Sequence, residues 1–249
     1  YTPAAFLEAL WAVMGECWRV LKPSGSVWVN LGDKYAGSAN TKPHTGTATI
    51  AKAGQKRNVS PMVPAPRSDV RAKSLIGLPW RFAIGCIDGQ ADPEGKGWIL
   101  RAEVVWAKPN GLPESVTDRV RRSHEQWFHF VKEPRYFCDI DPIREAHADV
   151  SLARTQRARL APDLSQVGVG SPNTLDPEQA CNPLGKLPDS VWTIPTQPLV
   201  VPESLGVDHF AAFPTEWPRR IITAWSPSGG VVLDPFGGTG TTAMVAKAL

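Results

Sequence analysis

The sequence predicts an α/β fold with a mostly parallel sheet, and its two ends carry that prediction. Residues 3–21 place apolar side chains at helical spacing, and a Lys22-Pro23-Ser24-Gly25 turn leads into a buried strand at 26–31. Residues 231–233 predict a second buried strand, which runs through a glycine-rich turn into a helix. A helix, a tight turn and a strand make half of a βαβ unit, so helices should cover the faces of a parallel sheet.

The segments between these ends predict further elements. A helix is expected over 74–88, and two strands over 98–108 and 124–132 are rich in β-branched and aromatic residues. The polar linker between the two strands predicts a long antiparallel hairpin at a sheet edge. Residues 216–226 predict an amphipathic helix whose apolar face is formed by Trp217, Ile221, Ile222 and Trp225.

The composition excludes several classes of protein. The 249 residues, 42% of them hydrophobic, suffice for one sizeable core and a smaller module. No apolar stretch is long enough to cross a bilayer, and none resembles a signal peptide. The four cysteines are scattered without a CxxC pair, which predicts neither zinc nor disulfides and favours a reducing cytoplasm. His124-Glu125 begins like a zinc-binding HExxH motif, but Phe128 stands where the second histidine belongs, so no metal is expected.

A basic segment stands out at 34–81. It carries nine basic side chains against the single acid Asp69, a local net charge of +8 in a chain of +3. Such a loop is expected to bind the phosphate backbone of DNA, because each phosphate that a basic side chain neutralises releases counterions, and this release favours binding. The alternative is a solvated insertion that contacts nothing. DNA contact is predicted for basic residues of this segment and of the hairpin linker: Lys52, Lys56, Arg57, Arg71, Lys73, Arg121 and Arg122.

The glycine-rich turn DPFGGTGTT at 234–242 is the strongest functional signal. Small residues let the backbone approach a ligand closely, and the following helix offers N–H groups at its start. A P-loop would need Gly-Lys-Ser/Thr, and a dinucleotide fold would need a complete GxGxxG; neither is present. A turn without a ligand is the alternative.

This turn and its surroundings resemble the β group of DNA amino-methyltransferases, the N6-adenine and N4-cytosine family. RVLKPSGSVWVNLGDKYAG at 19–37 resembles the helix and strand that follow the catalytic motif of that family, and residues 103–119 and 124–137 resemble its edge hairpin. HFAAFP at 209–214 resembles the segment that closes over the cofactor. The resemblance implies an incomplete Rossmann-like fold of S-adenosylmethionine-dependent methyltransferases. It implies S-adenosylmethionine binding by Asp234, Pro235, Phe236, Gly237, Gly238, Gly240, Thr241, Thr242, His209, Phe213 and Pro214.

The motif order of the family also implies a domain arrangement. Residues 1–143 would form the catalytic half, 144–204 the target-recognition region and 205–249 the cofactor-binding half. The catalytic motif of the family is Asp, Asn or Ser followed by Pro-Pro and an aromatic residue, and the chain contains no Pro-Pro dipeptide. That motif is expected before Tyr1, and the acid for the cofactor ribose after Leu249. The chain is therefore expected to be truncated at both ends and inactive by itself.

Five residues at strand ends are predicted to line a pocket for the target base, because open α/β sheets place their sites there. They are Asn30, Asp33, Trp106, Lys108 and Asn110. Each has an alternative role. Asn30 and Asp33 could belong to a strand-end turn, Lys108 and Asn110 could lie in a solvated loop, and Trp106 could be a core side chain.

Together the resemblance and the basic segment predict a DNA methyltransferase that modifies the exocyclic amine of adenine (N6) or cytosine (N4). Such an amine is a poor nucleophile, so the enzyme must localise its lone pair on a flipped base. The expected partners are double-stranded DNA and a restriction endonuclease, with no membrane, in a cytoplasm and with a bacterial or phage gene. The alternative is a catalytically inactive fragment or pseudoenzyme that binds DNA or the cofactor.

Overall fold

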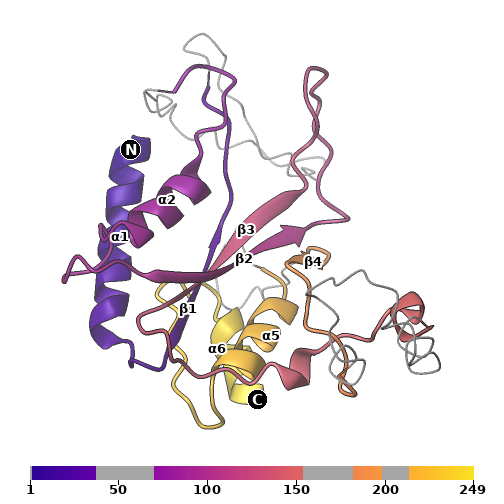
Figure 1. Cartoon of the computed structure of the whole chain (residues 1–249). Coiled ribbons are helices and arrows are strands. Elements are labelled where there is room, and N and C mark those ends of the chain that lie inside the picture. The colour runs from indigo at the N-terminus through magenta and orange to yellow at the C-terminus, as the bar shows by residue number, and fades with distance from the viewer. Residues whose placement is uncertain (1, 38–69, 154–181, 198–212) are drawn as a thin grey trace, which may run out of the picture. The chain divides into compact units, whose positions relative to one another are not determined.

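The computed structural model describes residues 2–37, 70–153, 182–197 and 213–249 (Figure 1). The chain forms two compact units. The first comprises residues 1–23, 27–103 and 124–134, and the second comprises 24–26, 104–123 and 135–249. None of the helices in the described part of the chain is long and apolar enough to cross a membrane.

The first unit packs two helices against strands. Helix α1 (Pro3–Val20) is capped by Thr2, whose hydroxyl accepts a hydrogen bond from the N–H of Ala5 at 3.2 Å. Strand β1 (Ser26–Leu31) follows, and helix α2 (Leu78–Ile87) packs against α1. The predicted helix and strand at 3–31 are therefore confirmed, although the residues of β1 are half-buried and not buried as expected.

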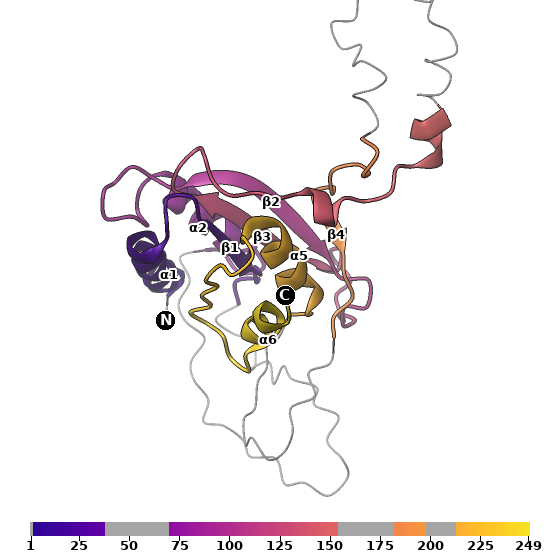
Figure 2. The same ribbon diagram turned by 90° about the horizontal axis from the view of Figure 1, so that it is seen from below.

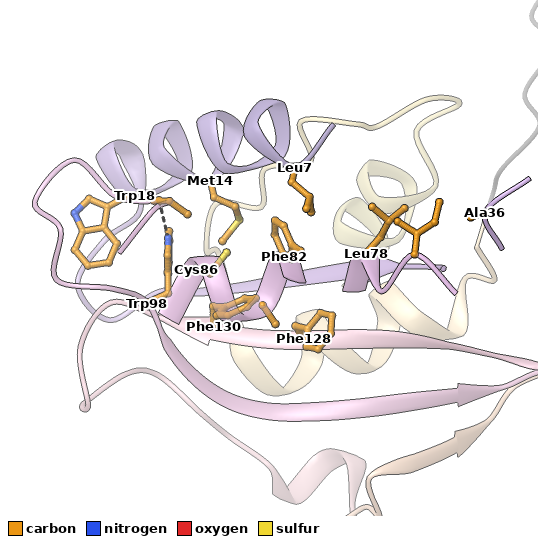
Figure 3. Close-up of a cluster of buried hydrophobic side chains, with 13 residues drawn as sticks. Leu7, Met14, Trp18, Ala36, Leu78, Phe82, Cys86, Trp98, Phe128 and Phe130 are labelled. Atoms are coloured by element: carbon orange, nitrogen blue, oxygen red, sulfur yellow. Dashed lines mark hydrogen bonds between the residues drawn. The ribbon is translucent and has the colours of Figure 1, made fainter. Parts of the chain in front are cut away.

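A buried apolar cluster holds the first unit together (Figure 3). Helix α1 contributes Leu7, Met14 and Trp18, and the rings of Trp18 and Trp98 meet edge to face with centroids 4.9 Å apart. Helix α2 contributes Phe82, which packs edge-on to Phe130 at 6.1 Å. Such edge-to-face aromatic pairs add specific geometry to the burial of area that drives the packing.

Within the described residues, four strands form one sheet in the order β1-β3-β2-β4. Strands β2 (Ile99–Ala107) and β3 (His124–Val131) are antiparallel neighbours, because the N–H of Lys108 binds the carbonyl of Ser123 where one ends and the other begins. The three-residue strand β4 (Val191–Thr193) pairs parallel with β2, with Val105 opposite Val191. The sheet is therefore mixed. The hairpin of β2 and β3 was expected at the sheet edge, but β4 pairs with β2 and takes the edge position instead.

The second unit contains the C-terminal helices. Helix α5 (Glu216–Trp225) lies against α6 (Thr241–Ala248), as Figure 2 shows, and also contacts the short helix η1 (Asp141–Ile143). The fully buried ring of Trp217 stacks on Trp192 of β4 with centroids 4.8 Å apart. This aromatic contact fixes β4 on α5, so the predicted amphipathic helix at 216–226 is confirmed together with its packing partner.

Two sequence-based predictions are wrong in detail. Residues 231–233 are not a strand, and the side chains of Val231 and Leu233 are 89% and 65% exposed. A strand needs a hydrogen-bonded neighbour, and no strand in the described residues pairs with this segment. The helix expected from residue 74 begins at Leu78, because Gly77 takes a left-handed φ of 79° that ends the preceding loop.

Candidate functional site

The glycine-rich turn is closed by the carboxylate of Asp234. One carboxylate oxygen accepts the N–H of Phe236 at 3.0 Å, and the other accepts the hydroxyl of Thr242 at 2.6 Å. The short charge-assisted bond to Thr242 ties the start of the turn to the first turn of α6. Asp234 therefore shapes the turn, while the ring of Phe236 stays 67% exposed beside it.

Two glycines give the turn a backbone path that other residues rarely follow. Gly238 has a φ of 50° and Gly240 a φ of 85°, both in the left-handed region. Gly240 is the N-cap of α6 and has no side chain to accept the N–H groups of the first helical turn. A Cβ built on Gly240 would meet no atom of the described residues within 4 Å, so the space beside the start of the helix is open. This arrangement can receive a polar or anionic ligand group at the helix N-terminus.

The segment before α5 contains two predicted cofactor residues that the structure describes, Phe213 and Pro214. Pro214 is fully buried, and its carbonyl accepts the N–H of Trp217 at 3.1 Å. The side chain of Gln197 accepts the N–H of Thr215 at 3.1 Å. Phe213 is half-buried, and the predicted cofactor residue His209 lies outside the described residues.

In the first unit, two predicted pocket residues lie at the end of β1. The side chains of both form hydrogen bonds to the backbone of other elements. The carboxylate of Asp33 accepts the N–H of Gly77 at 2.9 Å and the N–H of Leu78 at 3.1 Å, so it caps the start of α2. The amide of Asn30 donates to the carbonyl of Gln126 at 3.1 Å and links β1 to β3. A contact of either residue with a base stays a prediction.

In the second unit, the three remaining pocket residues lie at the end of β2. Trp106 is only 3% exposed, and its indole N–H donates to the carbonyl of Ile194 at 2.7 Å. The ammonium of Lys108 lies 4.1 Å from the centroid of the Trp106 ring. The carboxamide of Asn110 pairs with the backbone of Thr196, at 3.0 and 2.8 Å. Trp106 is thus a core side chain here, and a pocket at this strand end stays a prediction.

The predicted DNA-binding residues fall in different places. Arg71 and Lys73 occupy an exposed turn of the first unit, closed by the N–H of Ser74 on the carbonyl of Arg71. Arg121 and Arg122 lie in the linker between β2 and β3. Lys52, Lys56 and Arg57 lie outside the described residues, so their contact with DNA stays a prediction.

Comparison with known proteins decides the family. The family model described as DNA methylase matches residues 1–249. The chain belongs to the DNA methylase family.

Individual relatives agree with this assignment. The chain is 34% identical over 242 residues to the Type II methyltransferase M.Cfr9I of Citrobacter freundii, covering 97% of the chain and 63% of that protein. It is 34% identical over 248 residues to the Type II methyltransferase M.XycI of Xanthomonas campestris pv. cyanopsidis, covering 99% of the chain and 65% of that protein. The chain thus spans less than two thirds of the length of these relatives.

A solved structure has the same fold. The chain matches the PvuII DNA methyltransferase, described as cytosine-N4-specific, with a TM-score of 0.58 at 18% identity, over 99% of the chain and 64% of that structure. The predicted family and the predicted α/β methyltransferase fold are therefore confirmed.

The sequence interpretation missed two polar residues of this chain. Gln126 is 3% exposed, and its side-chain oxygen has no hydrogen-bond partner among the described residues. A glutamine on the same face of β3 as the core residues Phe128 and Phe130 was the available signal, since alternate residues of a strand share a face. Glu114 forms an ion pair with Arg119 at 2.6 Å inside the hairpin linker, which no local pattern indicated.

One buried histidine has an unusual environment. His129 of β3 is 2% exposed and stacks on Trp28 of β1, with ring centroids 4.5 Å apart and planes 6° from parallel. Burial, and secondly the positive charge of Arg101, lowers the pKa of His129 to about 3. The imidazole is therefore neutral at physiological pH. Within the described residues, no group of three or more His, Cys, Asp or Glu side chains could hold a metal ion.

Proposed function

We propose that this protein transfers a methyl group from S-adenosylmethionine to the exocyclic amine of adenine (N6) or cytosine (N4) in DNA. The observation that carries the proposal is the turn at 234–242. Asp234 closes it, two left-handed glycines shape it, and it opens the start of α6 to a ligand. Membership of the DNA methylase family supports this chemistry over that of other glycine-rich turns.

The residues present fit the cofactor. The open space beside Gly240 and the uncapped N–H groups of α6 suit the carboxylate of its methionine part. The exposed ring of Phe236 offers an apolar surface beside them. When bound, the cofactor supplies the sulfonium methyl group. The chain orients it through Asp234, Pro235, Phe236, Gly237, Gly238, Gly240, Thr241 and Thr242, with His209, Phe213 and Pro214 on the neighbouring segment.

We propose double-stranded DNA as the substrate. The local net charge of +8 at 34–81 in a chain of +3 supports a polyanionic partner. Placing the amine next to the methyl group requires the base to leave the helix, because the amine is not reachable in line within the duplex. Positioning of the two reactants would then supply most of the rate. Residues 144–204 would select the target sequence.

The biological setting is proposed from the relatives. M.Cfr9I and M.XycI are named Type II methyltransferases, and both come from bacteria. A protein of this kind would act in the bacterial cytoplasm, where the DNA lies, and would protect that DNA from a cognate restriction endonuclease.

The proposal is tested by methyl transfer. The full-length protein is incubated with methyl-labelled S-adenosylmethionine and mixed-sequence duplex DNA, and the DNA is digested to nucleosides for mass spectrometry. We expect label in N6-methyladenine or N4-methylcytosine, and which of the two appears identifies the target base. Label in 5-methylcytosine, or in RNA alone, would contradict the proposal.

A non-catalytic role makes a different prediction in the same experiment. A pseudoenzyme would bind both S-adenosylmethionine and DNA, measured by calorimetry and fluorescence anisotropy, yet transfer no label. Absence of both binding events would reject the two functions together.

A further inference from the structure

The linker between β2 and β3, residues 108–123, is a braced loop (Figure 1). At its base, the N–H of Lys108 binds the carbonyl of Ser123 at 2.8 Å. Further out, the guanidinium of Arg121 donates to the carbonyls of Gly111 and Leu112 across the loop, at 2.5 and 3.3 Å. These bonds join the outgoing and returning limbs, so the loop has a defined shape.

Two more contacts fix the loop. The guanidinium of Arg119 forms an ion pair with Glu114 at 2.6 Å and donates to the carbonyl of Val120 at 3.0 Å. The carboxamide of Asn110 pairs with both backbone groups of Thr196, which anchors the base of the loop to the segment after β4. Arg119 and Arg121 thus bind the backbone of the loop itself.

This bracing displays two aliphatic side chains to solvent. Leu112 is 88% exposed and Val120 is 86% exposed. They lie on opposite limbs beside the Arg121 crosslink, because Arg121 binds the carbonyl of Leu112 and directly follows Val120. A loop that is held rigid while it presents aliphatic side chains to water has the form of a contact surface for a partner.

The charge of the loop indicates the partner. Residues 108–123 carry four basic and two acidic side chains, a local net charge of +2. Proteins that distort DNA insert aliphatic side chains between neighbouring bases, and a positive net charge attracts such a loop to the phosphates. A protein partner at this loop would be expected to carry acidic groups around an apolar centre.

We propose that Leu112 and Val120 form an apolar wedge that contacts the bases of duplex DNA, and that Arg121 is the residue that positions it. This inference rests on the proposed function, because a base must be displaced from the stack before its amine can be methylated. The wedge would fill the space that the displaced base leaves and so favour the open state of the DNA.

Photo-crosslinking tests which molecule touches the loop. A photo-reactive phenylalanine analogue replaces Leu112 or Val120, and for comparison Ile84, an exposed residue of α2. With mixed-sequence duplex DNA, we expect protein–DNA adducts from positions 112 and 120 and few from position 84. Crosslinks to a second copy of the chain, or equal DNA adducts from all three positions, would overturn the wedge.

Salt dependence separates an apolar contact from a phosphate contact. The double variant Leu112→Ser/Val120→Ser should weaken DNA binding about tenfold while the slope of log K against log salt stays unchanged. The matched control Val20→Ser/Ile84→Ser, at exposed aliphatic positions of α1 and α2, should bind DNA like the parent. The variant Arg122→Ala should instead flatten the slope by roughly 0.9 for each phosphate that it leaves without a basic partner.

The outcomes distinguish this inference from the function on which it rests. If the parent binds and methylates DNA while the Leu112→Ser/Val120→Ser variant binds equally well, the wedge is wrong and the methyltransferase stands. If the parent binds no DNA, both are wrong.

Discussion

The indole of Trp11 lies in the space that a side chain at position 85 would fill, and residue 85 is glycine. A Cβ built on Gly85 would collide with the Cζ2 atom of Trp11, and the indole N–H donates to the carbonyl of Phe82 at 3.1 Å. The absence of a side chain at one position of α2 therefore lets a tryptophan of α1 cross it closely, and the two helices form the core of the first unit around this contact.

The first prediction concerns this contact. Gly85→Ala should lower the free energy of unfolding by about 2 kcal/mol, because overpacking of the rigid indole outweighs the gain in helix propensity. Urea denaturation followed by tryptophan fluorescence measures the change. Gly37→Ala is the matched control, since a Cβ on Gly37 meets nothing of the described chain within 4 Å. If Gly85→Ala is as stable as the parent, α1 and α2 can move apart without a loss in the free energy of unfolding.

The second prediction concerns Asp33 as the cap of α2. Asp33→Ala removes the acceptor of the N–H groups of Gly77 and Leu78, and should cost about 1 to 2 kcal/mol of stability. Asp33→Asn keeps one oxygen acceptor and should cost less. Chemical denaturation of the three proteins checks the order. An Asp33→Ala protein that keeps parental stability but no longer binds DNA would favour the base-pocket role instead.

The third prediction is a pH dependence set by His129, whose pKa is lowered from 6.5 to about 3 in the folded chain. Between these values the unfolded chain binds a proton that the folded chain does not, so stability falls as the pH is lowered from 6.5 towards 3. This contribution is at most about 1.4 kcal/mol per pH unit.

Comparison of variants isolates the histidine from the other titrating groups. His129→Phe keeps an aromatic ring against Trp28 and should flatten the decline of stability over this pH range. Parallel profiles for the parent and His129→Phe would show that His129 is protonated in the folded chain.

The fourth prediction concerns the cofactor turn. Gly238→Val should abolish S-adenosylmethionine binding in calorimetry, because a branched residue cannot easily adopt the φ of 50° and its side chain would occupy space for the ligand. Gly37→Val, at an exposed glycine with an ordinary φ and open space, should bind the cofactor normally. An unchanged affinity in Gly238→Val would mean that the cofactor does not use this turn.

The fifth prediction concerns the basic segment. Replacing Lys52, Lys56 and Arg57 with Ala should weaken DNA binding and reduce the slope of log K against log salt by roughly 0.9 for each phosphate that is no longer neutralised. Anisotropy titrations at a series of salt concentrations give the slope. A parental slope in the triple variant would indicate that these residues are only solvated.

The sequence by itself determined the elements whose signal lies in neighbouring residues along the chain. Apolar spacing defined α1, and β-branched and aromatic runs defined β2 and β3. The turn at 234–242 was recognisable because its function requires glycines at fixed positions along the chain. These features are encoded by neighbours in sequence, so one sequence is enough to find them.

Only the tertiary structure decided what distant residues do to each other. Asp33 caps a helix that begins 45 residues later, and Asn110 pairs with Thr196, 86 residues away. The start of α2, the three-residue β4 and the exposure of Val231 and Leu233 depend on which backbone groups find partners across the fold. Hydrogen bonding and burial are set by neighbours in space, and local propensity carries no information about them.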